Sequence, residues 1–367
     1  MMAVVKANAY GHGLPEVAKI LATSGKLKIQ NHAYRQAGSK LWFGVDSIDE
    51  ALTIRKLGIK NPILILGYIP PERLEEVTAN NISFSVYSKE LLRMIAKLGS
   101  STSKSIWKLN FQIQKPRMHI KIETGTNRLG MYFEELAEAA PLLKKYASWI
   151  EGAYTHFADT ENSRSSFWKE QIMRFKEAVV LLQKTGAHPI RHAASSAATL
   201  LYPEARYDMI RVGVSLYGLY PSENVRSSVS HILKPVLTWK TRFVQIKKVR
   251  RGDTIGYDRA FRALHDMTIG ILPIGYGDGY DRRFSSNGEV LVRGRRASIA
   301  GRICMNMIMV DITDVKNARE GDDVVLLGKQ KKEEMSAEEL AEKIGTIHYE
   351  VVTRINPLIA RTIIHDA

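Results

Sequence analysis

The segment Ala3-Val4-Val5-Lys6-Ala7-Asn8-Ala9-Tyr10-Gly11-His12-Gly13 places a lysine at the end of a short apolar run, directly before small residues and two glycines. A β-branched run followed by glycines predicts a strand that ends in a loop. A lysine there, with no carboxylate beside it in the sequence, can serve as an amine nucleophile, for instance in a Schiff base. Taken alone, the pattern is more typical of a strand-end lysine that reaches solvent, so the rest of the chain has to decide between the two interpretations.

Outward from this strand, short apolar runs alternate with amphipathic segments as far as about Tyr220. The alternation predicts βα units with a parallel sheet. Eight such runs in about 220 residues favour a closed (β/α)8 TIM-type barrel over an open sheet. The expected strands are residues 2–6, 41–45, 62–66, 82–87, 118–123, 150–156, 190–193 and 209–212.

The segments between the strands carry helix signals, such as the capping box formed by Ser47 with Glu50 and the stop at Gly58. Only seven helices separate the eight strands, so the eighth is either supplied after Tyr220 or missing at the N-terminus. The polar stretches 26–40 and 100–115 are expected to be surface loops. The clearest expected helices are residues 47–58, 88–99, 133–146 and 167–185.

A serine-rich stretch at residues 222–231 is expected to be a linker. The βα rhythm is absent after it, which predicts a mostly β C-terminal domain with a boundary near residue 230. The domains are then 1–230 and 231–367. In the second domain we expect strands at 239–249, 268–273, 289–292, 296–300, 307–312 and 323–327, and a capped helix at 336–344.

Composition narrows the class of protein. Lysine and arginine exceed aspartate and glutamate by 53 − 38 = 15, which raises nucleic acid as a partner. The basic residues are scattered and no recognition motif accompanies them, so we expect no nucleic acid and only some attraction for small anions. No signal peptide and no membrane-length apolar run are found, and Cys304 is the single cysteine. These features predict a cytoplasmic protein without a membrane partner.

Polar residues cluster where the expected barrel strands end. Because the carboxyl ends of barrel strands share one face, we expect these side chains to converge there. Each has a structural alternative: His156 would fit a buried core histidine, and Arg211 a partner of a buried acid. The backbone N–H groups of Ser196 and Gly213 are candidate phosphate donors. The strand-end set is Lys6, Lys121, Arg128, His156, Ser195, Ser196, Arg211 and Gly213.

Further segments in the second domain follow in a fixed order: Gly256-Tyr257-Asp258-Arg259, Pro273 to Gly279, Gly301 to Asn306 and Tyr349-Glu350-Val351. Together with the strand-end residues, they resemble the alanine racemase family, pyridoxal 5′-phosphate (PLP) enzymes of fold type III. The resemblance covers essentially the whole chain apart from the two polar insertions. It implies interconversion of L-alanine and D-alanine, which supplies D-alanine for peptidoglycan, with PLP as cofactor and no metal.

The resemblance also implies roles at the cofactor. Lys6 would bind PLP as a Schiff base, and Arg211 would face the pyridine nitrogen with His156 behind it. Arg128 would face the phenolic oxygen of PLP and the carboxylate of the substrate, oriented by Lys121, which is carbamylated in many relatives. The phosphate ligands would be Tyr10, Ser196, Gly213, Val214 and Tyr349.

By the same resemblance, Lys6 and Tyr257 are the two catalytic bases, one on each face of the substrate Cα. Tyr257 and Met305 would come from the partner subunit of a homodimer with shared active sites. Tyr257, Met305, Tyr276 and Tyr349 would crowd the pocket, so that it favours a side chain no larger than a methyl group.

Departures from the family pattern keep alternatives open. The chain starts on the lysine strand, whereas relatives begin with an earlier strand and helix, so we expect either a start assigned too late or a truncated form. Ser195 and Asn306 stand where asparagine and aspartate are usual. The alternatives are a broader racemase acting on serine or lysine, a fold type III decarboxylase, a non-catalytic PLP carrier and an inactive PLP-binding homologue. The decarboxylase lacks support because its glycine-rich phosphate loop and catalytic cysteine motif are not found, and the carrier because it would be a barrel alone.

Overall fold

The computed structural model describes residues 1–24, 41–100, 115–162, 164–229 and 232–364. The chain forms two compact units. The first contains Met1–Ala9 and Leu14–Lys234, and the second contains Tyr10–Gly13 and Pro235–Ala367. Both polar insertions predicted as surface loops fall almost entirely outside the described residues.

The first unit is built on eight parallel strands in the order β7-β6-β5-β4-β3-β2-β1-β8. This order confirms the predicted TIM-type barrel, and each observed strand lies within its predicted range. The strands are β1 (Met2–Val4), β2 (Trp42–Val45), β3 (Ile63–Ile65), β4 (Ser83–Val86), β5 (Met118–Lys121), β6 (Ile150–Tyr154), β7 (Ile190–His192) and β8 (Arg211–Val212).

The seam between β7 and β8 has no strand ladder among the described residues, but backbone hydrogen bonds cross it. The Arg211 N–H donates to the Ala194 carbonyl oxygen at 3.0 Å, and the Met209 N–H donates to the Arg191 carbonyl oxygen at 3.2 Å. The ring of strands is therefore nearly closed, and the carboxyl ends of all eight strands share one rim.

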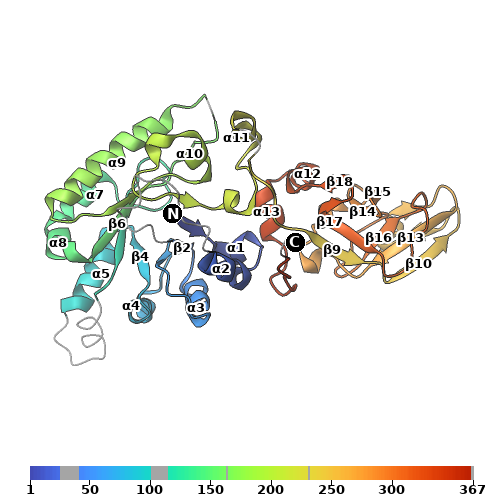
Figure 1. Cartoon of the computed structure of the whole chain (residues 1–367), viewed down its shortest axis with the longest axis horizontal. Helices are drawn as coiled ribbons and strands as arrows, with labels where there is room; N and C mark the ends of the chain where they lie inside the picture. The colour runs from blue at the N-terminus through green and yellow to red at the C-terminus, as the bar shows by residue number, and fades with distance from the viewer. Residues whose placement is uncertain (25–40, 101–114, 163, 230–231, 365–367) are drawn as a thin grey trace. The chain divides into compact units, whose positions relative to one another are not determined.

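Helices surround the strands of this unit (Figure 1). The predicted capping box is present: Ser47 and Glu50 cap α3 reciprocally. The predicted helix at 133–146 is instead two, because Pro141 stands in the first turn of the second one, where its missing N–H costs nothing. The helices are α2 (Leu14–Thr23), α3 (Ile48–Lys56), α4 (Leu74–Ala79), α5 (Lys89–Ser100), α7 (Phe133–Glu138), α8 (Ala140–Lys145), α9 (Phe167–Lys184), α10 (Ser196–Leu201) and α11 (Glu223–Ser228).

The expectation of a plain linker at residues 222–231 was wrong in part, because α11 occupies most of it. Ser222 caps this helix by accepting the Val225 N–H at 3.4 Å. Val225 is buried with Ala197 and Tyr220, and this packing gives a short serine-rich segment a reason to be helical.

The second unit is mostly β, as predicted, and its strand pairs are antiparallel. Its sheets have the orders β10-β13-β16 and β15-β14-β17-β18, with β9 on β17 and a separate β11-β12 hairpin. The predicted strand 239–249 is divided into β9 and β10, and the hairpin, β18 and α13 were not predicted. The elements are β9 (Trp239–Arg242), β10 (Gln245–Val249), β11 (Thr254–Ile255), β12 (Phe261–Arg262), β13 (Met267–Leu272), β14 (Glu289–Val292), β15 (Arg295–Ser298), β16 (Ile308–Asp311), β17 (Asp323–Gln330), β18 (Glu333–Met335), α12 (Ala337–Lys343) and α13 (His348–Thr353).

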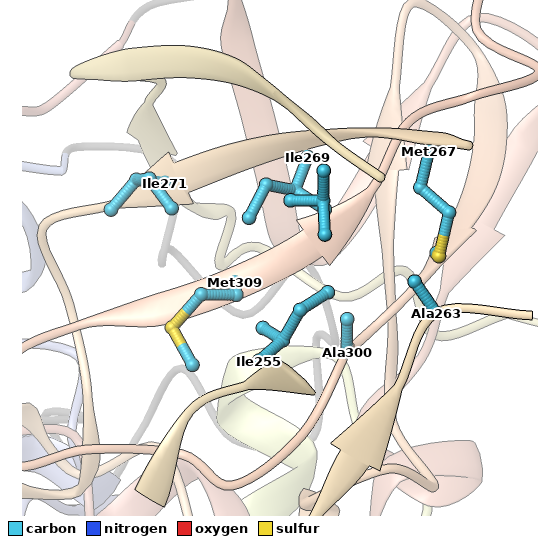
Figure 2. Close-up of a cluster of buried hydrophobic side chains, with 8 residues drawn as sticks. Ile255, Ala263, Met267, Ile269, Ile271, Ala300 and Met309 are labelled. Carbon is cyan, nitrogen blue, oxygen red and sulfur yellow. The ribbon is translucent and has the colours of Figure 1, made fainter. Parts of the chain in front are cut away.

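An apolar cluster in the second unit anchors the β11-β12 hairpin (Figure 2). Side chains from the hairpin and from β13 and β16 meet there and are almost fully buried. The cluster fixes both ends of the loop that carries Tyr257. Its labelled members are Ile255, Ala263, Met267, Ile269, Ile271, Ala300 and Met309.

Candidate active site

The strand-end lysine opens an unusual backbone segment, α1 (Lys6–Tyr10). Ala7, Asn8, Ala9 and Tyr10 all have φ between 52° and 54°, so the segment is a left-handed turn. Such a turn is unfavourable for residues with a Cβ and needs outside support. The Glu50 carboxylate accepts the Ala7 N–H at 2.7 Å, and Asn8 Oδ1 accepts the Leu14 N–H at 2.9 Å.

Lys6 itself lies at the rim of the barrel with 41% of its side chain exposed. No carboxylate is adjacent to Lys6 in the sequence, but in the fold the Asp46 Oδ1 atom is 3.3 Å from Lys6 Nζ. Asp46 follows β2, which pairs with β1, so the two side chains leave neighbouring strand ends. Strand pairing, which the local sequence does not reveal, creates this contact.

Arg211 is buried in β8 and donates hydrogen bonds through both Nη atoms. Nη1 donates to the carbonyl oxygen and to Nδ1 of His192, at 2.8 and 3.0 Å. Nη2 donates to the carbonyl oxygens of Thr155 and Ala193 and lies 3.3 Å from His156 Nδ1. No carboxylate among the described residues pairs with Arg211, so the alternative of a buried acid partner is not observed.

His192 is the contact of Arg211 that the sequence analysis missed. The predicted neighbour His156 is present, but the His192 ring lies closer to the guanidinium. Burial lowers the pKa of Arg211 to about 10, which leaves it charged at neutral pH. The remaining donor, Nε–H, has no acceptor among the residues that the structure describes.

His156 follows β6 and is the residue on which the predicted cations converge. Burial lowers its pKa to about 3, assisted by Arg211, Arg128, Lys121 and Lys6. The ring is therefore neutral and can accept a hydrogen bond. The charges of four predicted strand-end cations therefore all lower the pKa of the same residue, His156.

Lys121 ends β5 and is buried, with its Nζ atom 5.6 Å from the centre of the Tyr154 ring. Burial lowers its pKa to about 8, and Arg128, Arg211 and Lys6 add to the effect while Glu123 opposes it. An amine in this state is neutral in part of the population near neutral pH and is then nucleophilic.

Glu123 shapes the loop that carries Arg128, a role that was not predicted. Its carboxylate accepts the N–H groups of Gly125, Thr126 and Arg128 at 2.5, 2.6 and 3.3 Å. Burial would raise the pKa of Glu123, but these donors and the Asn127 N–H outweigh it and lower the pKa. Arg128 is exposed and pairs with no carboxylate in the described parts of the chain, so its charge can serve an anionic ligand.

Gln171 of α9 joins the same loop to the end of β6. Its Nε2 group donates to Thr124 Oγ1 at 3.1 Å and to the His156 carbonyl oxygen at 3.2 Å, and Oε1 accepts the Ala158 N–H at 2.9 Å. The sequence offered one signal for this role: Gln171 is a polar residue on the apolar face of the predicted helix 167–185. A glutamine buried there, as Gln171 is, needs hydrogen-bond partners.

The candidate phosphate donors lie after β7 and β8. Ser196 Oγ accepts the N–H groups of Gly213 and Ser215 at 3.0 and 3.4 Å. The Gly213 N–H was expected to be directed at phosphate, and the structure instead pairs it with Ser196. Ser215 Oγ is buried and has no partner in the described chain, which leaves a hydroxyl next to Ser196 for a ligand. Val214 begins a short 3₁₀ turn, Val214–Tyr217.

Tyr10 and Tyr349, the other predicted phosphate ligands, lie in the second unit with ring centres 6.2 Å apart. Burial raises the pKa of Tyr10 to about 12, so it stays a hydroxyl donor. Gly11 packs directly on α13: a Cβ there would stand 1.8 Å from the Val352 carbonyl oxygen.

The remaining predicted residues, Tyr257, Met305 and Tyr276, are exposed on the second unit, at 68%, 57% and 42%. The loops of Met305 and Tyr276 are joined by backbone hydrogen bonds, such as the Gly277 N–H to the Met305 carbonyl oxygen at 2.8 Å. Gly275 permits this approach, since a Cβ there would meet the Cys304 carbonyl oxygen at 2.1 Å.

Two family models match the chain. Alanine racemase, N-terminal domain, covers residues 1–221, and alanine racemase, C-terminal domain, covers residues 236–363. The chain belongs to the alanine racemase family.

Full-length relatives agree with this assignment. The alanine racemase of Carboxydothermus hydrogenoformans is 40% identical over 98% of this chain and 91% of its own length. That of Methanococcus maripaludis is 37% identical over 100% and 92%. The Bacillus anthracis alanine racemase, solved with bound L-Ala-P, superposes with a TM-score of 0.83 at 33% identity, covering 97% of this chain and 86% of that one.

The donor set of this alanine racemase family member fits PLP. Arg211 Nε–H suits a ring nitrogen that accepts a hydrogen bond, and the unpartnered Ser215 hydroxyl beside Ser196 suits a phosphate oxygen. Lys6 supplies an amine at the rim of the barrel. In the described part of the chain no cluster of metal ligands is found, and no helix there is long and apolar enough to cross a bilayer.

Proposed function

We propose that the chain interconverts L-alanine and D-alanine with PLP held by Lys6. Family membership supports this reaction class, and one observation carries the site: Arg211 Nη2 lies 3.3 Å from His156 Nδ1, and the charges of Arg211, Arg128, Lys121 and Lys6 all lower the pKa of this ring. Such a concentration of positive charge at the carboxyl ends of barrel strands attracts a ligand that carries phosphate and carboxylate groups.

PLP, when bound, supplies a conjugated electron-withdrawing ring that makes the Cα–H of an attached amino acid acidic. Arg211 determines how strongly the ring can withdraw electrons from Cα. Its guanidinium keeps its proton, so it donates a hydrogen bond from Nε and does not transfer a proton to the ring nitrogen. A weaker electron sink favours prompt return of a proton to Cα, which is the outcome that racemisation needs.

Inversion requires a proton to leave one face of Cα and another to arrive on the opposite face. We assign Lys6 Nζ to one face and the Tyr257 hydroxyl to the other, so that one group takes the Cα proton while the other gives one. Met305 and Tyr276, whose loops are bonded to each other, are the proposed limits on side-chain size.

Arg128 is the proposed partner of the substrate carboxylate, with Lys121 behind it. The buried Lys121 amine is disfavoured as a cation among other cations. Addition of CO2 to the neutral amine gives a carbamate and releases one proton, and the resulting anion would be attracted by Arg128. Mass spectrometry of the intact protein tests this group. A gain of the mass of one CO2 at neutral pH, which is lost in acid and is absent in Lys121→Met, would establish the carbamate.

Tyr257 and Met305 are proposed to serve the site of the partner subunit in a homodimer. Their exposure on the second unit supports this arrangement. Hybrid dimers made from Lys6→Ala and Tyr257→Phe protomers would keep one complete site, so refolding the two inactive variants together should restore up to about a quarter of the wild-type rate. No recovery, with dimers verified by sedimentation, would place both residues in the same subunit's site.

The proposed reaction is tested by circular dichroism of L-alanine and D-alanine in the presence of the PLP-loaded chain. Lys6→Ala is expected to lose both the visible absorbance of the lysine-bound cofactor and the racemisation. Lys60→Ala, at an exposed lysine outside the site, is the control. Racemisation of serine or lysine at a rate equal to that of alanine would favour the broader racemase, and full activity of Lys6→Ala would refute the assignment of Lys6.

A further inference from the structure

A row of buried polar side chains continues inward from Arg211 through the interior of the barrel. Arg211 Nη1 lies 3.0 Å from His192 Nδ1, and His192 Nε2 lies 2.9 Å from His119 Nδ1. His119 Nε2 lies 3.5 Å from Glu151 Oε2 and has no hydrogen-bond partner among the described residues. Both histidines have no exposed surface, and neither has a role in the proposed reaction.

The backbone makes room for this row. Gly152 lies opposite His119 in the β5-β6 pairing, and a Cβ at Gly152 would stand 2.2 Å from His119 Nδ1. The pairing shifts register between Met118 and His119, so that Glu151 is an extra residue on β6. A bulge of this kind redirects a side chain, and here the redirected carboxylate is the one that faces His119.

Hydrogen-bond donors fix the direction of the row. Arginine has donors only, so His192 Nδ1 must accept from Arg211 and the proton of a neutral His192 must sit on Nε2. That N–H donates to His119 Nδ1, which leaves the proton of a neutral His119 on Nε2, facing the carboxylate. One tautomer of each ring satisfies every contact, and any other places two donors or two acceptors together.

The surroundings keep both rings neutral. Burial lowers the pKa of His192, with further lowering from Arg211 and His119. Burial also lowers the pKa of His119, assisted by Arg117 and Arg211 and opposed by Glu151. The carboxylate is held by Arg117 and by Ser83 Oγ at 2.5 Å, and the Tyr154 ring stacks on His192 at 4.9 Å.

We propose that His119 and Glu151 are positioning residues for Arg211: His119, oriented by Glu151, accepts the N–H of His192, so that the His192 ring keeps its place, holds Nη1 and leaves Nε–H directed at the cofactor. The cofactor part of this inference rests on the proposed function. The tautomers belong to the protein alone and can be measured whether or not PLP binds.

The experiment has a direct arm and a functional arm. In the direct arm, NMR of the full chain carrying isotope-labelled histidine, with and without PLP, reports which ring nitrogen is protonated, and His192→Gln assigns the signals. We expect Nε2–H on both His192 and His119. A proton on Nδ1 of either ring overturns the proposal.

In the functional arm, His119→Gln is compared with His119→Leu. A glutamine can accept from His192 and donate to Glu151, whereas leucine can do neither. We expect His119→Leu to leave the buried His192 N–H without an acceptor and to weaken PLP binding about tenfold or more, and His119→Gln to keep the affinity close to wild type. Tyr154→Phe, which loses only the hydroxyl contact with Ser85 Oγ, is the matched control and should leave the tautomers unchanged.

The outcomes separate this proposal from the proposed function. Equal PLP affinity in the folded Gln and Leu variants would refute the positioning role while racemisation stands. Nε2–H on both His192 and His119 in a chain that binds no PLP would refute the proposed function and the cofactor part of this proposal. It would leave the hydrogen-bond order from Arg211 through His192 to His119 intact. If His119→Leu does not fold, Glu151→Ala replaces it: weaker PLP binding than in wild type is the expected result, and unchanged binding would overturn the positioning role.

Discussion

Lys121 is an amine that the barrel buries among arginines. Its pKa falls to about 8 because the folded chain disfavours the charged form. The residue therefore destabilises the fold at neutral pH, and its retention at such a place is consistent with a role in chemistry or binding.

We predict that Lys121→Met is more stable than wild type at pH 7, by about 1–3 kcal/mol in CO2-free buffer. Below the folded pKa of about 8, wild-type Lys121 is protonated in both states and its charging cost is complete. Between about 8 and 10.5 only the unfolded state keeps the proton, so wild-type stability rises with pH and the difference shrinks. Urea unfolding at pH 7 and pH 10 measures both values. Equal stability at pH 7 would show that the amine is not penalised by burial.

At the scale of elements, the left-handed turn after Lys6 depends on a capping box in another helix. Glu50 caps α3 through the N–H groups of Asp46 and Ser47, and its other oxygen accepts the Ala7 N–H. A single carboxylate thus supports a helix start and an unfavourable turn, and this turn carries the proposed Schiff-base lysine.

Glu50→Ala is accordingly expected to lower the free energy of unfolding by about 2 kcal/mol, more than the loss of a cap alone. It should also weaken PLP binding, because the turn next to Lys6 loses its acceptor. Asp49→Ala is the matched control: Asp49 lies in the same helical turn, is largely exposed and, among the described residues, forms an ion pair only with Arg73. Similar losses for the two variants, measured by urea unfolding, would contradict the double role of Glu50.

The eight barrel strands and the residues at their ends were predictable because apolar periodicity and strand ends are local signals. Two contacts could not be predicted: that of Lys6 with Asp46 and that of Arg211 with His192. Both depend on which strands pair and in what register. The β5-β6 bulge that redirects Glu151 has no local signal at all. The split of the helix at 133–146 was foreseeable from Pro141, which disfavours a continuous helix.

At the scale of the whole molecule, Tyr10–Gly13 belongs to the second unit although it lies between two parts of the first. The segment is seated on α13, where Gly11 approaches the Val352 carbonyl oxygen too closely for any Cβ. Gly11 also needs its φ of +80°, which glycine alone adopts easily.

Gly11→Ala should therefore be severely destabilising, by more than about 3 kcal/mol, or prevent folding. Gly58→Ala is the control, because Gly58 has a similar φ of +76° but open space around its Cβ position. It should cost only about 1 kcal/mol. Thermal unfolding of the two variants compares these values. Equal shifts in Tm would mean that the loss of stability at Gly11 comes from backbone strain and not from the close contact with α13.

The chain passes from one unit to the other three times, after Ala9, after Gly13 and after Lys234. A protease that cut only the last of these connections would leave the units joined through the other two. Recombination near residue 235 would likewise replace the C-terminal unit, and with it α13, by that of a relative. The new α13 would then have to pack against Gly11 of this chain. The two units are thus each compact but linked by more than one connection, and the four residues Tyr10–Gly13, next to Lys6, make that linkage.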